Sequence, residues 1–462
     1  MRIIDRPITL PPWGQDDGLL AHFESRTQNS LESDEIAVRF VVTRSDEAGF
    51  QCDVATLAGV TGLSMRAGSI FHFRRRTYEN TSQFNVALVI PTGIGCEIGG
   101  HAGDATPVAR LLASVCDNVV IHPNVVNASD INELTENCLY VEGSILTRLL
   151  MGTVGLQKVR ANRVLFVVEE HDKRVITDGA VNALSAARAT LGLNCPEVVR
   201  WKSDWTSTIE FTNSGRASGR IENLESLVEA LVARRYQYDS VAIASLIKTP
   251  PNLRNLAYNY YFNGLINPWG GVEAMLTHAL SMMLDVPTAH SPMFEAAEML
   301  EVGIIDPRKA AEAVSLTYLY SILKGLHRSP RLVTDVTAMQ GKGIISAEDI
   351  SCLVIPDGCL GLPTLAALDQ GITVIAVREN RNGMKNNLEA LPFRSGQLIK
   401  VDHYLEAAGV LAAIKAGIEP AAVRRPFPNT RVNKSGPVSA VRRNALFENL
   451  VPSRRNGRAD QK

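Results

Sequence analysis

Residues 85–110 read N-V-A-L-V-I-P-T-G-I-G-C-E-I-G-G-H-A-G-D-A-T-P-V-A-R. The apolar run at 86–90 indicates a buried strand, and Thr106-Pro107 is typical of the first residues of a helix. The glycines between them let the backbone turn sharply or approach a ligand closely. This stretch therefore predicts a strand, a glycine-rich loop and a helix, which is the repeating unit of an α/β fold.

Similar apolar runs recur at 164–168, 241–246, 353–355 and 373–377. Each is short and continuously apolar, as strands are when both faces of a parallel sheet are covered. Helical patterns lie between them, at 180–191, at 404–416 and in a long stretch after Asp306-Pro307. We therefore expect an α/β fold with a mostly parallel sheet and flanking helices.

The first part of the chain has a different pattern. Residues 36–42 and 50–57 partly alternate between apolar and polar, and a polar turn separates them, which is typical of a β-hairpin. We expect a small β-rich N-terminal domain at 1–83 and an α/β core domain at 84–420. A polar stretch at 203–220 reads as an exposed loop, so the core is open to division into two lobes near 203–240.

The last residues, 421–462, hold ten Lys or Arg and two acidic residues, with little periodicity. This composition predicts a disordered basic tail. An arm that binds an anionic partner or another copy of the chain is the alternative, and a homo-oligomer is compatible with it.

Composition excludes several kinds of partner. The chain has 462 residues and a net charge of -1, which gives no electrostatic case for binding nucleic acid or a membrane surface. Residues 1–12 lack the apolar region of a signal peptide. The seven cysteines are scattered and odd in number, which argues against a disulfide scaffold or a zinc ribbon. We expect a cytoplasmic protein whose partner is a small molecule.

The glycine-rich loop is the first candidate site. Backbone N–H groups of the loop, with the N-terminus of the helix that follows, suit a phosphate or carboxylate. The spacing G-x-G-x-x-x-G-G differs from the dinucleotide-binding pattern. Glycines that only permit close packing are the alternative. The candidate ligand-binding residues here are Gly93, Gly95, Gly99, Gly100 and His101.

Two reactive side chains accompany this loop. Asp104 lies just before the helix and is a candidate acid or base. Cys96 lies where a helix N-terminus would lower the pKa of a thiol, although a small residue filling a turn is the alternative. A second strand–glycine turn carries Cys359, and the two thiols together suggest the chemistry of a two-cysteine racemase.

Polar residues also follow other predicted strands. His122, Asn124 and Asn127 come after the run at 119–121, and Glu142 follows Tyr140-Val141. Residues beyond the carboxyl ends of parallel strands face the ligand crevice of an open α/β sheet. Hydrogen bonding of Asn within a loop is the alternative for the two asparagines.

Three further candidates lie in 267–290, where Glu273, His278 and His290 occur. Together with His122 they offer imidazole and carboxylate groups that could bind a divalent metal. Their positions are too dispersed in the sequence to match a known metal-binding motif, so a metal site is left as an open alternative. After the strand at 373–377, Arg378 could clamp a carboxylate and Glu379 could act as an acid or base. A surface ion pair is the alternative there.

Several motifs occur together in order: P-T-G-I-G-x-x-I-G-G-x-A-G-D-A-x-P-V-A-R, H-P-N, Y-V-E-G, G-x-E-A, A-H-x-P and E-N. In this the chain resembles a family catalogued as domain of unknown function 3326, over residues of about 85–418. The resemblance implies one shared fold and one shared site, but no reaction. It implies less weight for Cys96 and more for the following residues: Asp104, His122, Asn124, Glu142, Glu273, His278, His290 and Glu379.

These observations predict an enzyme acting on a small, polar, anionic metabolite of the amino-acid or carboxylate type. Its chemistry would be acid–base or metal-assisted, and its catalytic residues would be His122, Asp104, Glu142, His290 and Glu379. The residues that hold the substrate would be Gly93, Gly95, Gly99, Gly100, His101, Asn124, Asn127 and Arg378. A two-cysteine enzyme using Cys96 and Cys359 is one alternative, and a metabolite sensor or carrier without catalysis is another.

Overall fold

A computed structural model describes the following residues: 1–14, 18–59, 68–101, 104–126, 128–253, 255–293, 303–314, 318–427, 429–430 and 432. Residues 1–417 form one compact unit and residues 418–462 a second one. In the second unit the described part contains a short 3₁₀ turn, Pro420–Val423. The tail that was expected to be disordered lies mostly outside the described residues.

The larger sheet of the first unit has ten strands and is mixed. Its strands in spatial order are β17 (Leu360–Gly361), β2 (Glu35–Asp46), β3 (Gly49–Ala58), β1 (Arg2–Leu10), β11 (Ala217–Glu222), β10 (Thr206–Phe211), β12 (Ser240–Lys248), β8 (Val164–Glu169) and β9 (Val198–Trp201), and β13 (Thr288–Met293) also pairs with β12. The pairings among β1, β2, β3, β10 and β11 are antiparallel, and those of β12 with β8, β10 and β13 are parallel.

The second sheet has six strands, all parallel. Its order is β19 (Leu398–Val401), β18 (Thr373–Val377), β16 (Ile350–Pro356), β4 (Asn85–Leu88), β5 (Asn118–Ile121) and β6 (Cys138–Tyr140). A small third sheet joins β14 (Arg331–Val333), β7 (Gly155–Gln157) and β15 (Ile344–Ile345). The α/β fold is therefore present, but a mostly parallel sheet is not confirmed, because the larger sheet is mixed.

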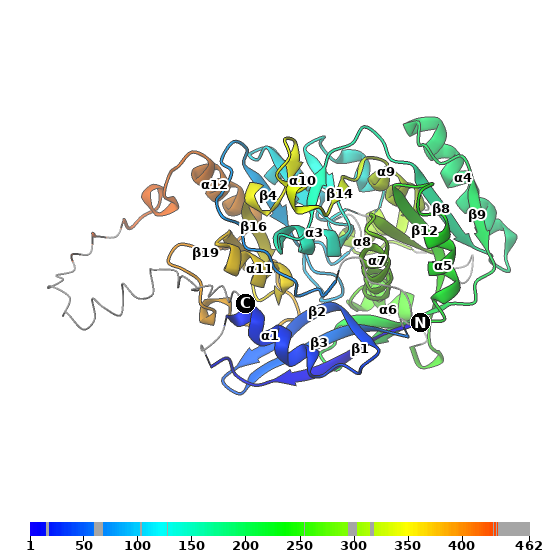
Figure 1. The fold of residues 1–462 in the computed structure, drawn as a ribbon, viewed down its shortest axis with the longest axis horizontal. Coiled ribbons are helices and arrows are strands. Elements are labelled where there is room, and N and C mark those ends of the chain that lie inside the picture. The colour runs from blue at the N-terminus through cyan, green and yellow to red at the C-terminus, as the bar shows by residue number, and fades with distance from the viewer. Residues whose placement is uncertain are drawn as a thin grey trace, which may run out of the picture. The chain divides into compact units, whose positions relative to one another are not determined.

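Helices connect and cover these sheets (Figure 1). They are α1 (Leu19–Gln28), α2 (Thr106–Ala113), α3 (Gly143–Leu150), α4 (Arg174–Leu191), α5 (Glu225–Ala233), α6 (Leu256–Asn263), α7 (Gly270–Leu284), α8 (Pro307–Val314), α9 (Tyr318–Arg328), α10 (Val336–Met339), α11 (Leu362–Gln370) and α12 (Tyr404–Lys415). Helix α7 packs against β2, β10, β11 and β13 of the larger sheet and against α3, which follows β6 of the parallel sheet.

The N-terminal hairpin is present as β2 and β3, and it continues into the larger sheet because β1 pairs with β11. The polar stretch at 203–220 was predicted as an exposed loop, and this is wrong. It forms β10 and β11, whose inward residues such as Ile209 and Ile221 are buried. Pattern alone missed these strands because Arg216 and Gly219, which read as loop residues, are both enclosed by the fold.

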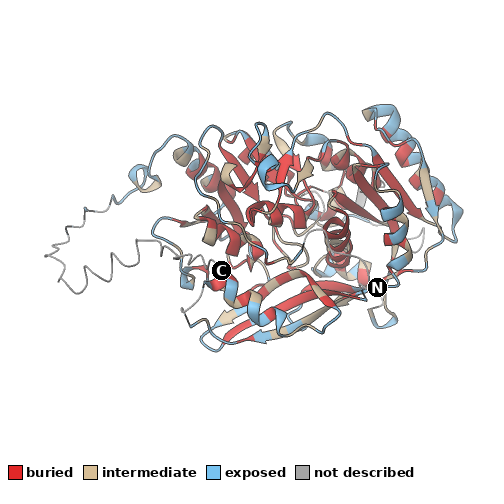
Figure 2. Cartoon of the chain, in the orientation of Figure 1, coloured by how far each residue is buried: buried red, intermediate tan, exposed pale blue. Residues whose placement is uncertain are grey.

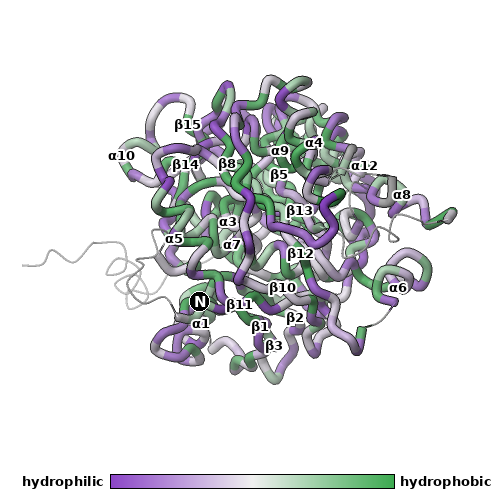
Figure 3. The backbone as a smooth tube through the Cα atoms, turned by 90° about the vertical axis from the view of Figure 1, so that its right-hand side faces the viewer, coloured by the Kyte–Doolittle hydropathy of each residue, from purple (hydrophilic) through white to green (hydrophobic). Residues whose placement is uncertain are grey.

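Burial follows the sheets and α7. Figure 2 shows α7 and the central strands largely buried, among them β4, β5 and β16 of the parallel sheet and β8 and β12 of the larger sheet, with exposed residues on the outer helices such as α4. Figure 3 marks the same interior helix α7 mainly as hydrophobic. Helix α7 carries eleven buried residues, so its few polar side chains are fixed in position by the packing around them.

Candidate functional site

Two adjoining cavities lie where the carboxyl end of the parallel sheet meets α7. Five residues line both of them: Thr92, His122, Gly143, Ala274 and His278. One cavity, here called the His–Glu cavity, encloses about 1210 Å³ including space open to solvent. The other, here called the arginine cavity, encloses about 1010 Å³ counted in the same way.

The His–Glu cavity collects the residues that follow several strands. His122 and Asn124 follow β5, Glu142 follows β6, and His290 lies in β13. Helix α7 adds Glu273, Thr277 and His278 from the opposite wall. The structure thus brings together six residues that the sequence singled out: His122, Asn124, Glu142, Glu273, His278 and His290.

Glu142 and His278 form the first pair. Glu142 Oε1 lies 2.6 Å from Nδ1 of His278, although the contact does not have the geometry of a regular hydrogen bond. Glu142 also accepts hydrogen bonds from the Ser144 amide and hydroxyl and from Thr277. Its burial opposes ionisation, but His278 and Ser144 outweigh this effect and lower the pKa of the carboxyl group. Glu142 is 2% exposed and His278 17%, so the imidazole is the member that a ligand can reach.

Glu273 and His290 form the second pair, with the exposures reversed. His290 Nδ1 lies 2.9 Å from Glu273 Oε2, and His290 Nε2 lies 2.9 Å from the hydroxyl oxygen of Ser245. The imidazole is 1% exposed and the carboxylate 22%. Since both ring nitrogens of His290 are engaged, this residue orients Glu273, and Glu273 is the member that faces a ligand.

His122 is buried and held in one protonation state. The backbone N–H of Ile90 donates a hydrogen bond to His122 Nε2 at 3.1 Å, so the proton of the neutral ring lies on Nδ1. Burial, reinforced by His278 and Arg39 and opposed by Glu142, lowers the pKa of His122 to about 4. His122 is therefore neutral near pH 7, and its Nε2 is not available as a base or a metal ligand.

His101 reaches this cavity only through other side chains. The hydroxyl of Tyr260 donates to Glu312, which lines the His–Glu cavity, and the same hydroxyl lies 3.1 Å from His101 Nδ1. Burial, together with Lys309 and Arg308, lowers the pKa of His101 to about 4. His101 thus supports Tyr260 as a neutral ring.

The glycines of 93–100 contact protein rather than either cavity. A Cβ atom at Gly93 would lie 2.6 Å from the carbonyl oxygen of Ala217, and one at Gly99 would lie 2.7 Å from a side-chain carbon of Ile90. Gly95 faces Ile266 in the same way. Asn124 holds the loop by donating to the carbonyls of Ile90 and Gly99. These observations favour the close-packing alternative for the glycine residues.

Replacing Gly100 by alanine is expected to destabilise the protein by about 1–3 kcal/mol or more. The added Cβ would lie 2.0 Å from the carbonyl oxygen of Cys96, so the loop must shift. Urea denaturation measures the change. Gly179→Ala is the matched control, because nothing lies within 4 Å of that position in α4 and alanine there should add about 0.5–1 kcal/mol. Equal stability of Gly100→Ala and the wild type would contradict this account of the loop.

Asp104 closes the same loop and does not line either cavity described above. Its carboxylate accepts a hydrogen bond from the Gly99 amide at 2.8 Å. Burial raises the pKa of Asp104 to about 7, against the opposing effect of backbone amides including those of Gly99 and His101. The structure therefore places Asp104 as a support of the loop.

This raised pKa gives a pH dependence with a defined sign. Between about pH 4 and pH 7 the folded protein holds the Asp104 proton that the unfolded chain loses, so this group's contribution to stability falls as pH rises and is constant above about pH 7. Urea denaturation of the wild type and Asp104→Asn across this range isolates the effect, because other groups cancel in the difference. The wild type should lose stability relative to the variant as pH rises, and a constant difference would be the contrary result.

Arg378 and Glu379 lie away from the cavities, and both are exposed. Arg378 pairs with Asp402 at 2.7 Å, and both partners are more than half exposed. This matches the surface ion pair that was the alternative from sequence. Asn380, the next residue, is buried and bonds the backbone of Ile98, so the E-N motif serves to anchor the first glycine loop.

The two thiols of the glycine turns lie together. Cys96 and Cys359 are both 2% exposed, and the two thiols are neighbours that interact electrostatically. Burial, followed by the neighbouring Cys96, raises the pKa of the Cys359 thiol well above its usual value. Cys359 also lines the arginine cavity. The structure therefore brings the two thiols of the glycine turns close to each other.

The described residues do not form the metal site that was considered from the sequence. Within the described ranges, no group of three or more His, Cys, Asp or Glu side chains is placed to hold a metal ion. The engaged nitrogens of His122 and His290 give a physical reason, since neither ring offers a free lone pair. Asn127, another candidate, lies outside the described residues.

Sequence reasoning did not single out several residues of the site, among them Arg39, Arg148, Ser245 and Thr277. Arg39 is the one charge inside the apolar strand I-A-V-R-F-V-V, and Arg148 interrupts the apolar face of α3 in the same way. A charge within an otherwise buried segment is a usable signal, because such residues are rarely buried without a partner. Ser245 and Thr277 carry no comparable signal.

Fold and site together define an α/β protein with a histidine–carboxylate cavity at the carboxyl end of a parallel sheet. Residues 85–424 match the family described as Protein of unknown function (DUF3326), and the chain belongs to this family. An uncharacterized lipoprotein of Synechococcus sp. is 34% identical over 341 residues, which is 73% of this chain and 92% of that protein. No solved structure gives a significant match. The resemblance noted in the motifs is thus confirmed.

No helix in the described part of the chain combines the length and the apolar character needed to cross a membrane.

Proposed function

We propose that this protein is an enzyme that transfers protons on a small organic acid bound at the junction of the two cavities. The observation that carries the proposal is the presence of two histidine–carboxylate pairs with opposite exposures in one cavity. In one pair the accessible group is the imidazole of His278, and in the other it is the carboxylate of Glu273. Each is oriented by a buried partner, Glu142 or His290.

General acid–base catalysis needs one group that accepts a proton and another that donates one, each in reach of the substrate. Environments that differ for two neighbouring titratable groups separate these roles. Glu273 and His278 both line the His–Glu cavity from α7, so a substrate there can contact both. One removes a proton from a carbon atom, and the other returns a proton to a second atom of the same substrate, which balances the reaction as an isomerisation.

The proposal revises the roles predicted from sequence. Glu273 and His278 become the catalytic residues, and Glu142 and His290 become positioning residues. His122 provides a fixed neutral ring beside them. Asp104, Glu379 and the glycines receive no catalytic role, and the cytoplasmic location and a homo-oligomer stay predictions.

Proton transfer can be tested before the natural substrate is known. The protein is incubated in D₂O with a library of small carboxylic acids, and exchange of carbon-bound hydrogen for deuterium is followed by NMR. Under the proposal, at least one acid that binds the protein exchanges a hydrogen faster than in buffer. Binding of an acid without any exchange would favour the alternative of a sensor or carrier and would count against the enzyme.

The two-cysteine alternative is kept because Cys96 and Cys359 are neighbours. It differs from the main proposal in its dependence on sulfur. Exchange that survives the double substitution Cys96→Ala, Cys359→Ala supports the histidine–carboxylate chemistry. Exchange that is lost there, while Glu273→Gln retains it, would support the thiols.

A further inference from the structure

Arg39 is a cation without a carboxylate partner. It lies in β2, and its Nη2 donates to the carbonyl oxygen of Thr92 at 3.0 Å. Its Nη1 is buried and has no hydrogen-bond partner. Within the described part of the chain, no carboxylate lies within ion-pair distance of this guanidinium. Burial lowers the pKa of Arg39 to about 10, which reflects the cost of holding this charge away from water.

The same sheet shows how the fold treats a buried arginine that has only a structural role. Arg216 is 1% exposed and pairs with two buried carboxylates, those of Asp5 and Asp53. A buried charge without such compensation is unfavourable. Asp5, Asp53 and Glu142 act on Arg39 only from beyond ion-pair distance, and Arg216 opposes them, so an anionic ligand in contact with Arg39 would supply a counter-charge that the fold does not provide there.

A second guanidinium lines the same arginine cavity. Arg148 of α3 pairs with Asp285 through Nη2 at 2.8 Å, and its side chain is 10% exposed. Its Nε and Nη1 are buried without partners. Two arginines with unused N–H groups therefore line one cavity, and the planar fork of arginine matches a carboxylate or a phosphate.

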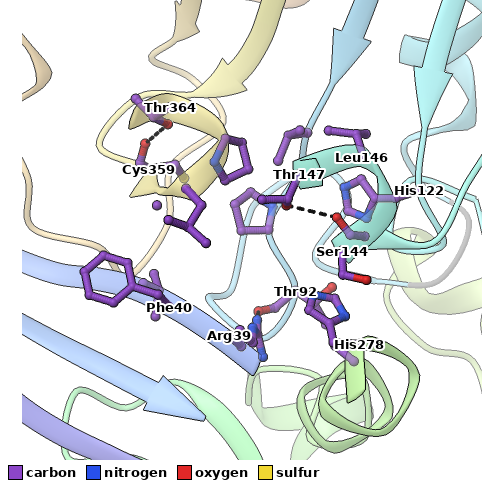
Figure 4. A pocket seen from close by; sticks show the side chains of 18 of the residues that line it. Arg39, Phe40, Thr92, His122, Ser144, Leu146, Thr147, His278, Cys359 and Thr364 are labelled. Carbon is purple, nitrogen blue, oxygen red and sulfur yellow. Dashed lines mark hydrogen bonds between the residues drawn. The ribbon is translucent and has the colours of Figure 1, made fainter. Parts of the chain in front are cut away.

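The rest of the arginine cavity is mainly apolar, with walls that include Val38, Phe40, Leu146, Met282, Leu360 and Met384. Figure 4 shows Arg39 beside Thr92, with His278 and His122 among the side chains that surround the cavity. His278 belongs to the lining of both cavities. An anion held by Arg39 would therefore lie next to the imidazole to which we assign proton transfer.

We propose that the arginine cavity binds an organic anion that carries an apolar group, with Arg39 as the main anchor of the anionic group and Arg148 as a second donor. The apolar group contacts the aliphatic and aromatic walls, and a polar end extends towards His278 and the His–Glu cavity. Such an anion is the substrate class of the proposed enzyme. The assignment of proton transfer to this anion rests on the proposed function, whereas the binding site itself is inferred from the contacts of Arg39 and Arg148.

The test uses hexanoate, hexanamide and acetate as probes of the full chain by isothermal titration calorimetry. Hexanoate should bind, the uncharged hexanamide should bind about 10- to 100-fold more weakly, and acetate should also be weak because it lacks the apolar group. Octyl phosphate in the same assay separates phosphate from carboxylate as the preferred anionic group. The proposal would be overturned if hexanamide bound as tightly as hexanoate. It would also be overturned if neither hexanoate nor octyl phosphate bound measurably.

Arg39→Met tests the anchor, because methionine keeps an apolar stem and removes the charge. Hexanoate affinity should fall about 10- to 100-fold, with hexanamide unchanged. Loss of an uncompensated charge should leave the thermal midpoint unchanged or raised, so the variant folds. Arg74→Met is the matched control, since Arg74 also has a buried unpartnered Nη1 but lies outside both cavities. Full hexanoate affinity in Arg39→Met would contradict the assignment.

The outcome is separable from that of the proposed function. If hexanoate binding depends on Arg39 but no acid exchanges deuterium, the anion site is supported and the enzymatic function is rejected. If an acid exchanges deuterium but its binding does not depend on Arg39, the enzymatic function is supported and the anion site at Arg39 is rejected.

Discussion

Replacing His278 by asparagine is expected to slow deuterium exchange on a bound acid by about 10²- to 10⁴-fold. The imidazole is the accessible member of the Glu142–His278 pair, and asparagine cannot accept and return a proton at neutral pH. Exchange rates are measured by NMR on the acid that wild-type protein turns over. Circular dichroism and the thermal midpoint report whether the variant is folded.

Two further variants sharpen this test. Glu142→Gln removes the carboxylate that orients His278, and the double variant should be little worse than His278→Asn because the two residues act as a unit. His72→Asn is the matched control, since His72 is exposed. The assignment of His278 as the catalytic imidazole would be contradicted if His278→Asn exchanged deuterium at the wild-type rate. It would also be contradicted if the rate losses of Glu142→Gln and His278→Asn added in the variant that carries both substitutions.

Replacing Arg216 by alanine is expected to reduce the free energy of unfolding by about 3–5 kcal/mol. Arg216 Nε donates to Asp53 at 3.1 Å and its Nη2 pairs with Asp5, all three side chains being at most 3% exposed. Ser218 and Ser214 also donate hydrogen bonds to Asp5 and Asp53, respectively. Alanine would leave two buried carboxylates without the cation that contacts them, and urea denaturation at pH 7 measures the loss.

Arg220→Ala is the control for this prediction. Arg220 lies on the same strand, β11, and pairs with Glu210 at 3.0 Å, but 45% of the Arg220 side chain is exposed. Its loss should cost about 0–1 kcal/mol because water screens the pair. Substituting Arg216, Asp5 and Asp53 together by apolar residues should recover much of the stability lost in Arg216→Ala. If Arg216→Ala and Arg220→Ala cost the same, burial is not what sets the energy of the network.

Three of the predicted residues that line the His–Glu cavity follow or lie in a strand of a parallel pairing, whereas Glu273 and His278 lie in helix α7. His122 and Glu142 come after β5 and β6, and His290 lies in β13, which pairs in parallel with β12. Strand ends can be recognised from apolar runs, and parallel strands bring their carboxyl ends to one edge. The sequence could therefore predict that these residues approach a common site.

The environment of the glycines from Gly93 to Gly100 could not be predicted from the sequence. Glycine has the same appearance in sequence whether its bare backbone faces a ligand or another part of the chain. Only the structure reveals Ala217 and Ile90 packed against these positions. Arg378 gives a second example, because a strand-end arginine faces either a crevice or solvent depending on which side its loop lies.

The sequence by itself determined the α/β class, the positions of apolar strands such as β4, β8, β12 and β18, and three histidines and two carboxylates that lie in the His–Glu cavity. These features depend on local pattern, since periodicity and strand ends are properties of short segments. The tertiary structure alone decided which member of each pair is accessible, that β10 and β11 belong to the mixed sheet, and that Arg39 has no carboxylate at ion-pair distance within the described part of the chain. Burial and pairing depend on residues far apart in the chain, for example Glu142 and His278, and no local pattern contains that information.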